Sequence, residues 1–207
     1  MSSLTAFVSN AMGQTALSGT KTLGSGGDYA TWADLATAIS GNGLSGDLTV
    51  EVISDLTSSA SITLTNNATN PTSSTKKITI DGKGKKLTSN HGHAALILDG
   101  IDYLTLKDYS IDQAATSSNV KGIQFMGGAD YNHIDGVKIH FSGLTNSTTS
   151  TSTGGAYIVF SSSTTSLFSS PTTFLGVGNT IENCSMTTRS GSQGPTAAVF
   201  IGGSTSV

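Results

Sequence analysis

Short runs of alternating apolar and polar residues recur along the chain and can be laid over one another. Three of them share the order apolar, polar, turn-former, apolar, polar, apolar; they are residues 106–111, 134–139 and 181–186. An apolar run precedes each one, at 96–100, 123–128 and 157–160, and another at 199–203 begins the cycle again. A degenerate repeat with paired strand-like runs predicts β-strands that stack in successive coils, which is a solenoid of the all-β class.

The alignment of these runs predicts which residues occupy equivalent places in successive coils. Three sets follow: Leu106, Ile134 and Ile181 in the core; Tyr109, Val137 and Cys184, also pointing inward; and Asp108, Gly136 and Asn183 between them. Residues of the last set tolerate left-handed backbone, so we expect a tight bend there in every coil. Since equivalent residues are unevenly spaced, the extra length must lie in loops, at 143–155 and 161–178, both rich in Ser and Thr.

One segment near the N-terminus shows helical rather than strand periodicity. Thr31 is a good N-cap and Asp34 completes a capping box, so a helix is expected over Thr31–Ser40, ending at the Gly-Asn-Gly run. Its apolar face comprises Trp32, Leu35, Ala36 and Ile39. We expect this helix to cover the open end of the apolar core, with Trp32 as a plug rather than a ligand platform.

The same pattern divides the chain into three parts. Residues 1–23 are a weakly patterned lead-in, which the sequence leaves open as the remnant of a secretion signal or as a first strand. Residues 24–47 form an initial segment that contains the capping helix, and residues 48–207 form the coils. No polar closing segment follows 199–203, so we expect the coils to continue beyond the chain end, or another subunit to cover them.

Composition narrows the classes of partner. Only 11% of the residues are charged, but 36% are hydrophobic, so the chain is expected to fold although it holds 32 Ser and 31 Thr. Ten basic and thirteen acidic residues give no excess of positive charge to bind phosphates, which argues against a nucleic-acid partner. The one basic cluster, expected to be a solvated surface, is Lys76, Lys77, Lys83, Lys85 and Lys86. No run approaches the roughly 20 apolar residues that span a bilayer.

Histidine and cysteine positions do not predict a metal site. The single cysteine, Cys184, excludes an intramolecular disulfide and a thiolate cluster. His91 and His93 would face the same side of a strand, a spacing suited to a metal, but no third ligand is evident. His133 and His140 belong to the next coil, and their register does not clearly bring them close. We therefore assign no metal and no cofactor, and expect surface histidines.

Acidic residues are the second source of candidate chemistry. The candidates for a carboxylate cluster are Asp99, Asp102, Asp108, Asp112, Asp130 and Asp135. In the alignment Asp108 lies near Gly136, and Lys107 near Asp135, which is typical of a charge-balanced surface. The single arginine, Arg189, has no acidic neighbour in its own segment. No catalytic residue is assigned; the sequence favours a non-catalytic protein and leaves a polysaccharide lyase or hydrolase open.

Two segments resemble a known fold family. Residues 23–39, followed by 48–52, look like the initial segment of pectin-lyase-like right-handed parallel β-helices. With residues 179–184 and the Gly-Gly units between strands, the chain is most similar to the secreted β-helix repeat proteins of Bacteroidetes, which are often exported by type IX secretion. The resemblance implies a right-handed parallel β-helix with a short N-terminal capping helix, secreted or on the cell surface.

The resulting functional hypothesis is a non-catalytic extracellular or cell-surface module that acts as an adhesin, stalk or filament component. Its expected partners are a second copy, by end-to-end stacking, or surface polysaccharide. A carbohydrate-active or sugar-binding β-helix is the first alternative, and a segment of a phage tail fibre is the second. A groove lined by acids, arginine and aromatic rings would favour the enzyme, because one fold of this kind carries many functions.

Overall fold

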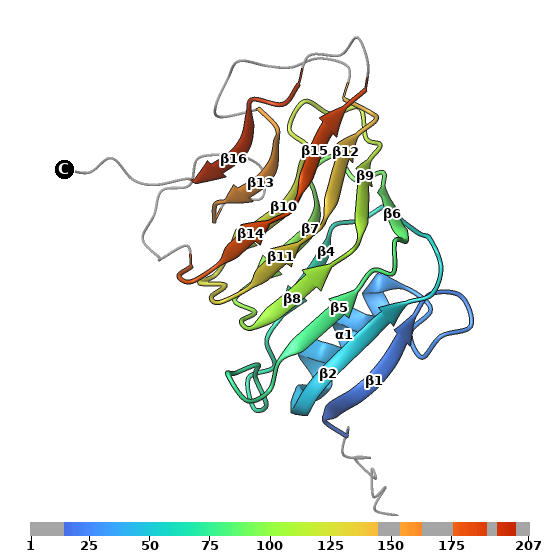
Figure 1. Cartoon of the computed structure of the whole chain (residues 1–207), viewed down its shortest axis with the longest axis vertical. Coiled ribbons are helices and arrows are strands. Elements are labelled where there is room, and N and C mark those ends of the chain that lie inside the picture. Colours follow the sequence, from blue (N-terminus) through green and yellow to red (C-terminus); the bar gives the residue numbers. More distant parts are fainter. Residues whose placement is uncertain (1–14, 145–153, 163–175, 190–193, 202–207) are drawn as a thin grey trace, which may run out of the picture.

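A computed structural model shows a protein built from three parallel β-sheets and one helix (Figure 1). The structure describes residues 15–144, 154–162, 176–189 and 194–201. Sheet A contains β1 (Leu17–Leu23), β2 (Leu44–Val52), β5 (Ile78–Asp81), β8 (Leu104–Lys107), β11 (His133–Asp135) and β14 (Thr180–Glu182), in that order. Its first strand lies within the predicted lead-in.

The other two sheets have five strands each. Sheet B contains, in spatial order, β3 (Leu56–Ser58), β6 (Lys86–Ser89), β9 (Ser110–Gln113), β12 (Lys138–Phe141) and β15 (Ser185–Thr188). Sheet C contains β4 (Ile62–Thr65), β7 (Ala94–Asp99), β10 (Lys121–Met126), β13 (Ala156–Phe160) and β16 (Ala197–Ile201). From β2 onward the chain visits the sheets in the order A, B, C, and it completes five such cycles within the described residues.

Strand register confirms the alignment of the repeats. In sheet A, Ile134 pairs with Leu106 on one side and with Ile181 on the other. In sheet C, Ile123 pairs with both Leu96 and Ile158. The side chains of the first four cycles at these positions are fully buried, because alternate residues of a strand point to opposite faces and the apolar ones face the core. The all-β, parallel class expected from the sequence is thus confirmed.

Tight bends join sheet A to sheet B where the sequence predicts them. Asp108, Gly136 and Asn183 have φ angles of 47°, 63° and 54°, which is the left-handed region. Cys184 follows the last of these bends and packs against the core while remaining half-buried, and burial raises the pKa of its thiol. Most of the two predicted long loops, 143–155 and 161–178, lies outside the described residues.

The predicted capping helix is present as α1 (Trp32–Asn42), two residues longer at its C-terminal end than expected. The capping box forms, because the Thr31 hydroxyl accepts from Asp34 N and the Asp34 carboxylate accepts from Thr31 N. At the other end, Asn67 Nδ2 donates to two of the last carbonyl groups of the helix, at 2.7 and 3.0 Å. The helix packs against β4 and β1, at the end of the stack from which the cycles begin.

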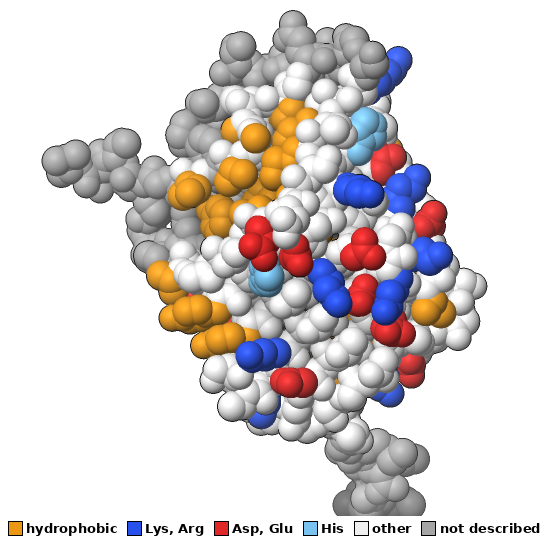
Figure 2. Space-filling model, viewed as in Figure 1, with side chains coloured by type: hydrophobic (Ala, Val, Ile, Leu, Met, Phe, Trp, Pro, Cys, Tyr) orange, Lys and Arg blue, Asp and Glu red, His pale blue; other side chains and the backbone are white. Residues whose placement is uncertain are grey.

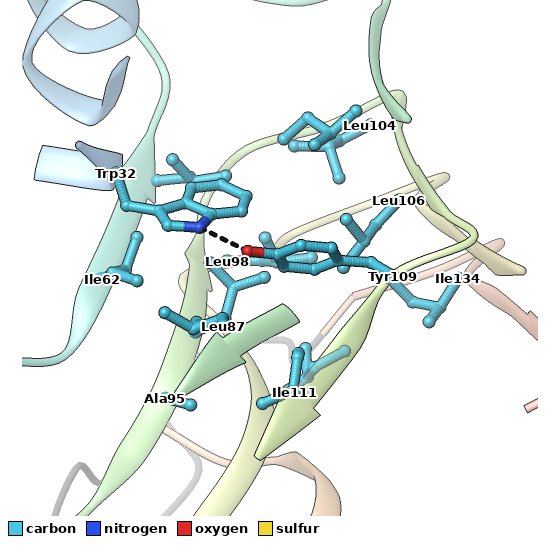
Figure 3. Close-up of a cluster of buried hydrophobic side chains, with 14 of the residues drawn as sticks. Trp32, Ile62, Leu87, Ala95, Leu98, Leu104, Leu106, Tyr109, Ile111 and Ile134 are labelled. Carbon is cyan, nitrogen blue, oxygen red and sulfur yellow. Dashed lines mark hydrogen bonds between the residues drawn. The ribbon is translucent and has the colours of Figure 1, made fainter. Parts of the chain in front are cut away.

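Trp32 seals the core at this end. Its side chain is 3% exposed, and its indole Nε1 donates a hydrogen bond of 2.9 Å to the hydroxyl of Tyr109 (Figure 3). Tyr109 comes from the bend between β8 and β9, so one contact joins the helix to the third cycle. Both rings lie among leucine and isoleucine side chains from all three sheets. The structure therefore places Trp32 as the expected plug.

Candidate functional groove and charged columns

Charged side chains gather on the outer faces of sheets A and B (Figure 2). Because parallel strands in register place equivalent residues side by side, these side chains form columns that run across the strands. One column of sheet A consists of Glu51, Asp81, Lys107, Asp135 and Glu182. The predicted neighbours Lys107 and Asp135 are adjacent in this register.

Lys83 and Lys107 neutralise the first two carboxylates of this column, Glu51 and Asp81. Lys83 Nζ lies 3.1 Å from Glu51 and 3.3 Å from Asp81, while Lys107 Nζ lies 3.1 Å from Asp81. Burial acts to raise the pKa of Asp81, but the hydrogen bonds from the two lysines outweigh it and the pKa is lowered. Lys107 therefore pairs with Asp81 rather than with Asp135.

A groove of about 350 Å³ crosses the outer face of sheet B. It runs over four strands, β6, β9, β12 and β15, and two columns of side chains line it. The first column is Lys86, Ser110, Lys138 and Ser185; the second is Thr88, Asp112, His140 and Thr187, of which all but Thr88 line the groove. Lysine alternates with serine, so the Cα atoms of the two lysines lie two strands apart, or about 10 Å.

The second column supplies an acceptor and an imidazole to the same groove. Asp112 lies beside His140 in register, and His140 Nδ1 is 2.9 Å from the hydroxyl of Thr187. Asp112 Oδ1 is buried and has no hydrogen-bond partner among the described residues. A buried acceptor left unpaired costs free energy.

Beside the second half of this column, His133 joins Asp135 and Glu182 in a cluster that the sequence did not predict. His133 Nε2 lies 2.8 Å from Glu182 Oε1, and one ligand atom each from His133, Asp135 and Glu182 lies within 4.8 Å of the others. Asn183 Nδ2 donates to Asp135 Oδ1 at 2.8 Å. The alignment of Ile134 with Ile181 implies that Asp135 and Glu182 are neighbours, but it does not show that the His133 side chain reaches Glu182.

The predicted histidine pair lies elsewhere. His91 and His93 are in the connection between β6 and β7, so strand geometry does not relate them, and their rings are 5.4 Å apart. Burial, followed by the charges of Lys121 and His91, lowers the pKa of His93. Lys121 is itself buried, which lowers the pKa of its amine to about 8. No described Asp, Glu or Cys joins these histidines in a possible metal-binding group.

The candidate acids do not converge on one place. Asp102 and Asp130 hold backbone: Asp102 Oδ1 accepts from Asp130 N at 2.8 Å, and Asp130 Oδ1 accepts from Val177 N at 2.7 Å. Burial, more than the neighbouring charge of Asp130, raises the pKa of Asp102. Asp108 is exposed at its bend. Arg189 is exposed at the end of β15 and is not among the residues that line the sheet B groove.

Tyr103 and Tyr131 form a partly exposed aromatic pair, and both faces of the Tyr131 ring are covered. Tyr103 and Tyr131 stack with centroids 5.1 Å apart, and Tyr131 is 51% exposed. A side-chain carbon built on Gly178 would lie 2.5 Å from the Tyr131 ring, so this glycine packs on the ring as well. The pair is therefore a structural stack at the corner that precedes sheet A.

Comparisons with protein-family models, with curated proteins and with solved structures found no match to this chain. No helix of the described residues is long and apolar enough to cross a membrane.

Proposed function

We propose that the protein is a non-catalytic, extracellular or cell-surface module with a right-handed parallel β-helix fold, and that it acts as an adhesin, stalk or filament component. Three parallel sheets visited in cyclic order support the β-helix. Crossovers between parallel strands are right-handed in nearly all proteins, which supports the hand. The resemblance to pectin-lyase-like and Bacteroidetes exported β-helix proteins supports the location.

The observation that carries the proposal is the difference between the two ends of the stack. Helix α1 covers the core at one end. At the other end hydrophobic side chains gather over the strands β14, β15 and β16 of the last described cycle (Figure 2). Val199 and Ile201 are 43% and 72% exposed, and Ile181 and Met186 are only half-buried. An apolar surface of this kind marks an interaction site.

Among the described residues only the end at β14–β16 is apolar, so two copies would meet through like ends and form a closed, two-fold dimer, which suits an adhesin or a stalk better than an open filament. We expect light scattering to report twice the chain mass, and negative-stain microscopy to show particles of doubled length. Ile201→Lys is expected to convert the dimer to a monomer, since a buried unpaired ammonium group is costly. Val177→Lys is the matched control, because Val177 is also 43% exposed but lies outside the last cycle's strands.

A wild-type monomer at every concentration tested would contradict association through this end. A dimer that Ile201→Lys leaves intact would place the contact elsewhere on the molecule.

The groove on sheet B favours a second candidate function, the binding of an acidic polysaccharide. Lys86 and Lys138 would meet carboxylates about 10 Å apart along a chain laid across the strands, and the carboxylate of Asp112, which lines the groove, would accept from a sugar hydroxyl. The described groove lining contains one acid, Asp112, and no Arg, Phe, Trp or Tyr side chain.

We expect the double variant Lys86→Ala/Lys138→Ala to bind polygalacturonate at least about tenfold more weakly than wild type, a loss of about 1.4 kcal/mol. The control is Lys76→Ala/Lys77→Ala, which removes the same charge from outside the groove. Calorimetric titration at two salt concentrations measures both. Equal losses in the two variants would indicate attraction by net charge alone, and the release of reducing ends would support the enzyme instead.

A further inference from the structure

We propose that His133, Asp135 and Glu182 form a binding site for a divalent transition-metal ion of the zinc class, which links β11 to β14. The register brings them together. His133 and Asp135 are two apart on β11 with buried Ile134 between them, so both side chains stand on the outer face. Glu182 is the partner of Asp135 on β14.

The chemical character of the three groups selects the ion. An imidazole nitrogen and two carboxylate oxygens suit Zn²⁺ and its neighbours in the first transition row, whereas Ca²⁺ and Mg²⁺ take oxygen ligands alone. Three protein ligands leave a fourth position for water, since zinc is most often four-coordinate. One imidazole and two carboxylates therefore suffice as protein ligands for zinc, and no cysteine is needed.

The distances require only small adjustments. Tetrahedral zinc with bonds of about 2.0–2.1 Å places its ligand atoms about 3.3 Å apart. Nε2 of His133 and Oε1 of Glu182 are now 2.8 Å apart, and all three ligand atoms lie within 4.8 Å of one another. Rotation of the exposed Glu182 and the half-buried His133 and Asp135 side chains covers these differences. Asn183 already holds one oxygen of Asp135 at 2.8 Å, as an outer-shell partner that orients a ligand.

The distribution of charge along the sheet A column also favours a cation beside Asp135 and Glu182. Its other carboxylate pair, Glu51 and Asp81, is neutralised by Lys83 and Lys107. Among the described residues no lysine or arginine forms an ion pair with Asp135 or Glu182, although these like charges are direct neighbours on adjacent strands. Like charges placed directly opposite repel, so a divalent cation would relieve the repulsion.

Binding would have a structural consequence. A long stretch of chain separates β11 from β14, and the site would clamp the first strand of the last cycle to the cycle before it. An ion that binds only the folded state raises its stability. The metal would therefore lock the last cycle, whose apolar side chains are the most exposed.

The test is calorimetric titration of Zn²⁺ into the whole chain after removal of bound metal, with thermal unfolding measured in parallel. We expect one ion per chain in the wild type, and affinity at least about tenfold weaker in His133→Ala and in the isosteric Glu182→Gln. Zinc should raise the unfolding temperature of the wild type but not of these variants. Co²⁺ should give visible absorption bands that His133→Ala loses.

Two controls separate this site from other histidines. His140→Ala removes the histidine of the sheet B groove, and His91→Ala disrupts the pair at the β6–β7 connection; both should bind zinc like the wild type. Absence of binding in the wild type would overturn the proposal. So would unchanged affinity in both His133→Ala and Glu182→Gln, or an equal loss in either control.

Discussion

Replacing Trp32 by alanine is expected to destabilise the protein by about 3–5 kcal/mol, the range measured for removing a large buried aromatic side chain. The indole is 3% exposed and fills the end of the core. Its loss also leaves the buried hydroxyl of Tyr109 without the hydrogen bond from Nε1. Urea unfolding followed by circular dichroism measures the change as a lower midpoint.

Matched variants separate packing from hydrogen bonding at this contact. Trp32→Phe keeps a ring but loses the donor, so its cost should be smaller than that of the alanine variant. Tyr109→Phe removes the acceptor and leaves the indole N–H unpaired, at a cost of about 1–3 kcal/mol. In the double variant Trp32→Phe/Tyr109→Phe neither an indole N–H nor a tyrosine hydroxyl is left unpaired. Its loss of stability should therefore be smaller than the sum of the losses in the two single variants.

The outcome bears directly on how the stack is closed. A loss below about 1 kcal/mol for Trp32→Ala would mean that α1 does not seal the core, and that the first cycle is closed by other residues. The contrast with the other end would then disappear, and with it the argument that only like ends associate.

Local signals in the sequence predicted much of this architecture. Thr31 and Asp34 form the expected capping box, and Asp108 and Asn183 adopt the left-handed bends, because each feature depends on residues close in sequence. The repeat alignment also predicted the pairing of Leu106 with Ile134. In a stack of parallel strands a repeat in the sequence becomes a neighbour in space, so these long-range contacts could be predicted as well.

The contacts that sequence reasoning missed lie between unlike positions. Trp32 and Tyr109 are 77 residues apart and belong to a helix and a bend, so no alignment relates them. His133 contacts Glu182 diagonally: its direct partner on the neighbouring strand is Thr180, and Glu182 lies two residues further along that strand. Pattern analysis treats outer positions as solvent-exposed, and their side chains become a site only when the register and the side-chain directions are both known.

Gly82 illustrates how a turn residue can be a core residue. In the sequence Gly82 is only a glycine beside the lysine cluster that we expect to be a solvated surface. In the structure Gly82 is buried, and the backbone of Tyr109 from the next cycle packs directly on it. This close approach positions the residue whose side chain reaches Trp32, so the bend and the helix plug depend on one another.

Gly82→Ala is therefore expected to cost about 3 kcal/mol, at the upper end of the range for overpacking a core. The new carbon would lie 2.5 Å from Cβ and 2.6 Å from Cα of Tyr109, and against the carbonyl oxygen of Asp108. These are backbone positions that cannot rotate away. The bend is also held by Gly82 N donating to Lys107 O at 2.8 Å, so a shift would break sheet pairing.

Gly46→Ala is the matched control for this prediction. Gly46 lies in β2 of sheet A and, like Gly82, has φ outside the left-handed region, but a carbon added there would meet only Ser18 Cβ, at an ordinary 3.6 Å. Its effect on stability should be within about 0.5 kcal/mol of zero, as for substitutions that make only ordinary contacts.

If both variants unfold at the same urea concentration, successive cycles do not pack closely at Gly82, and Tyr109 is then not held against Trp32 by the stacking of the backbone. If only Gly82→Ala is destabilised, and Tyr109→Phe partly masks its effect, the close approach and the plug form one coupled unit.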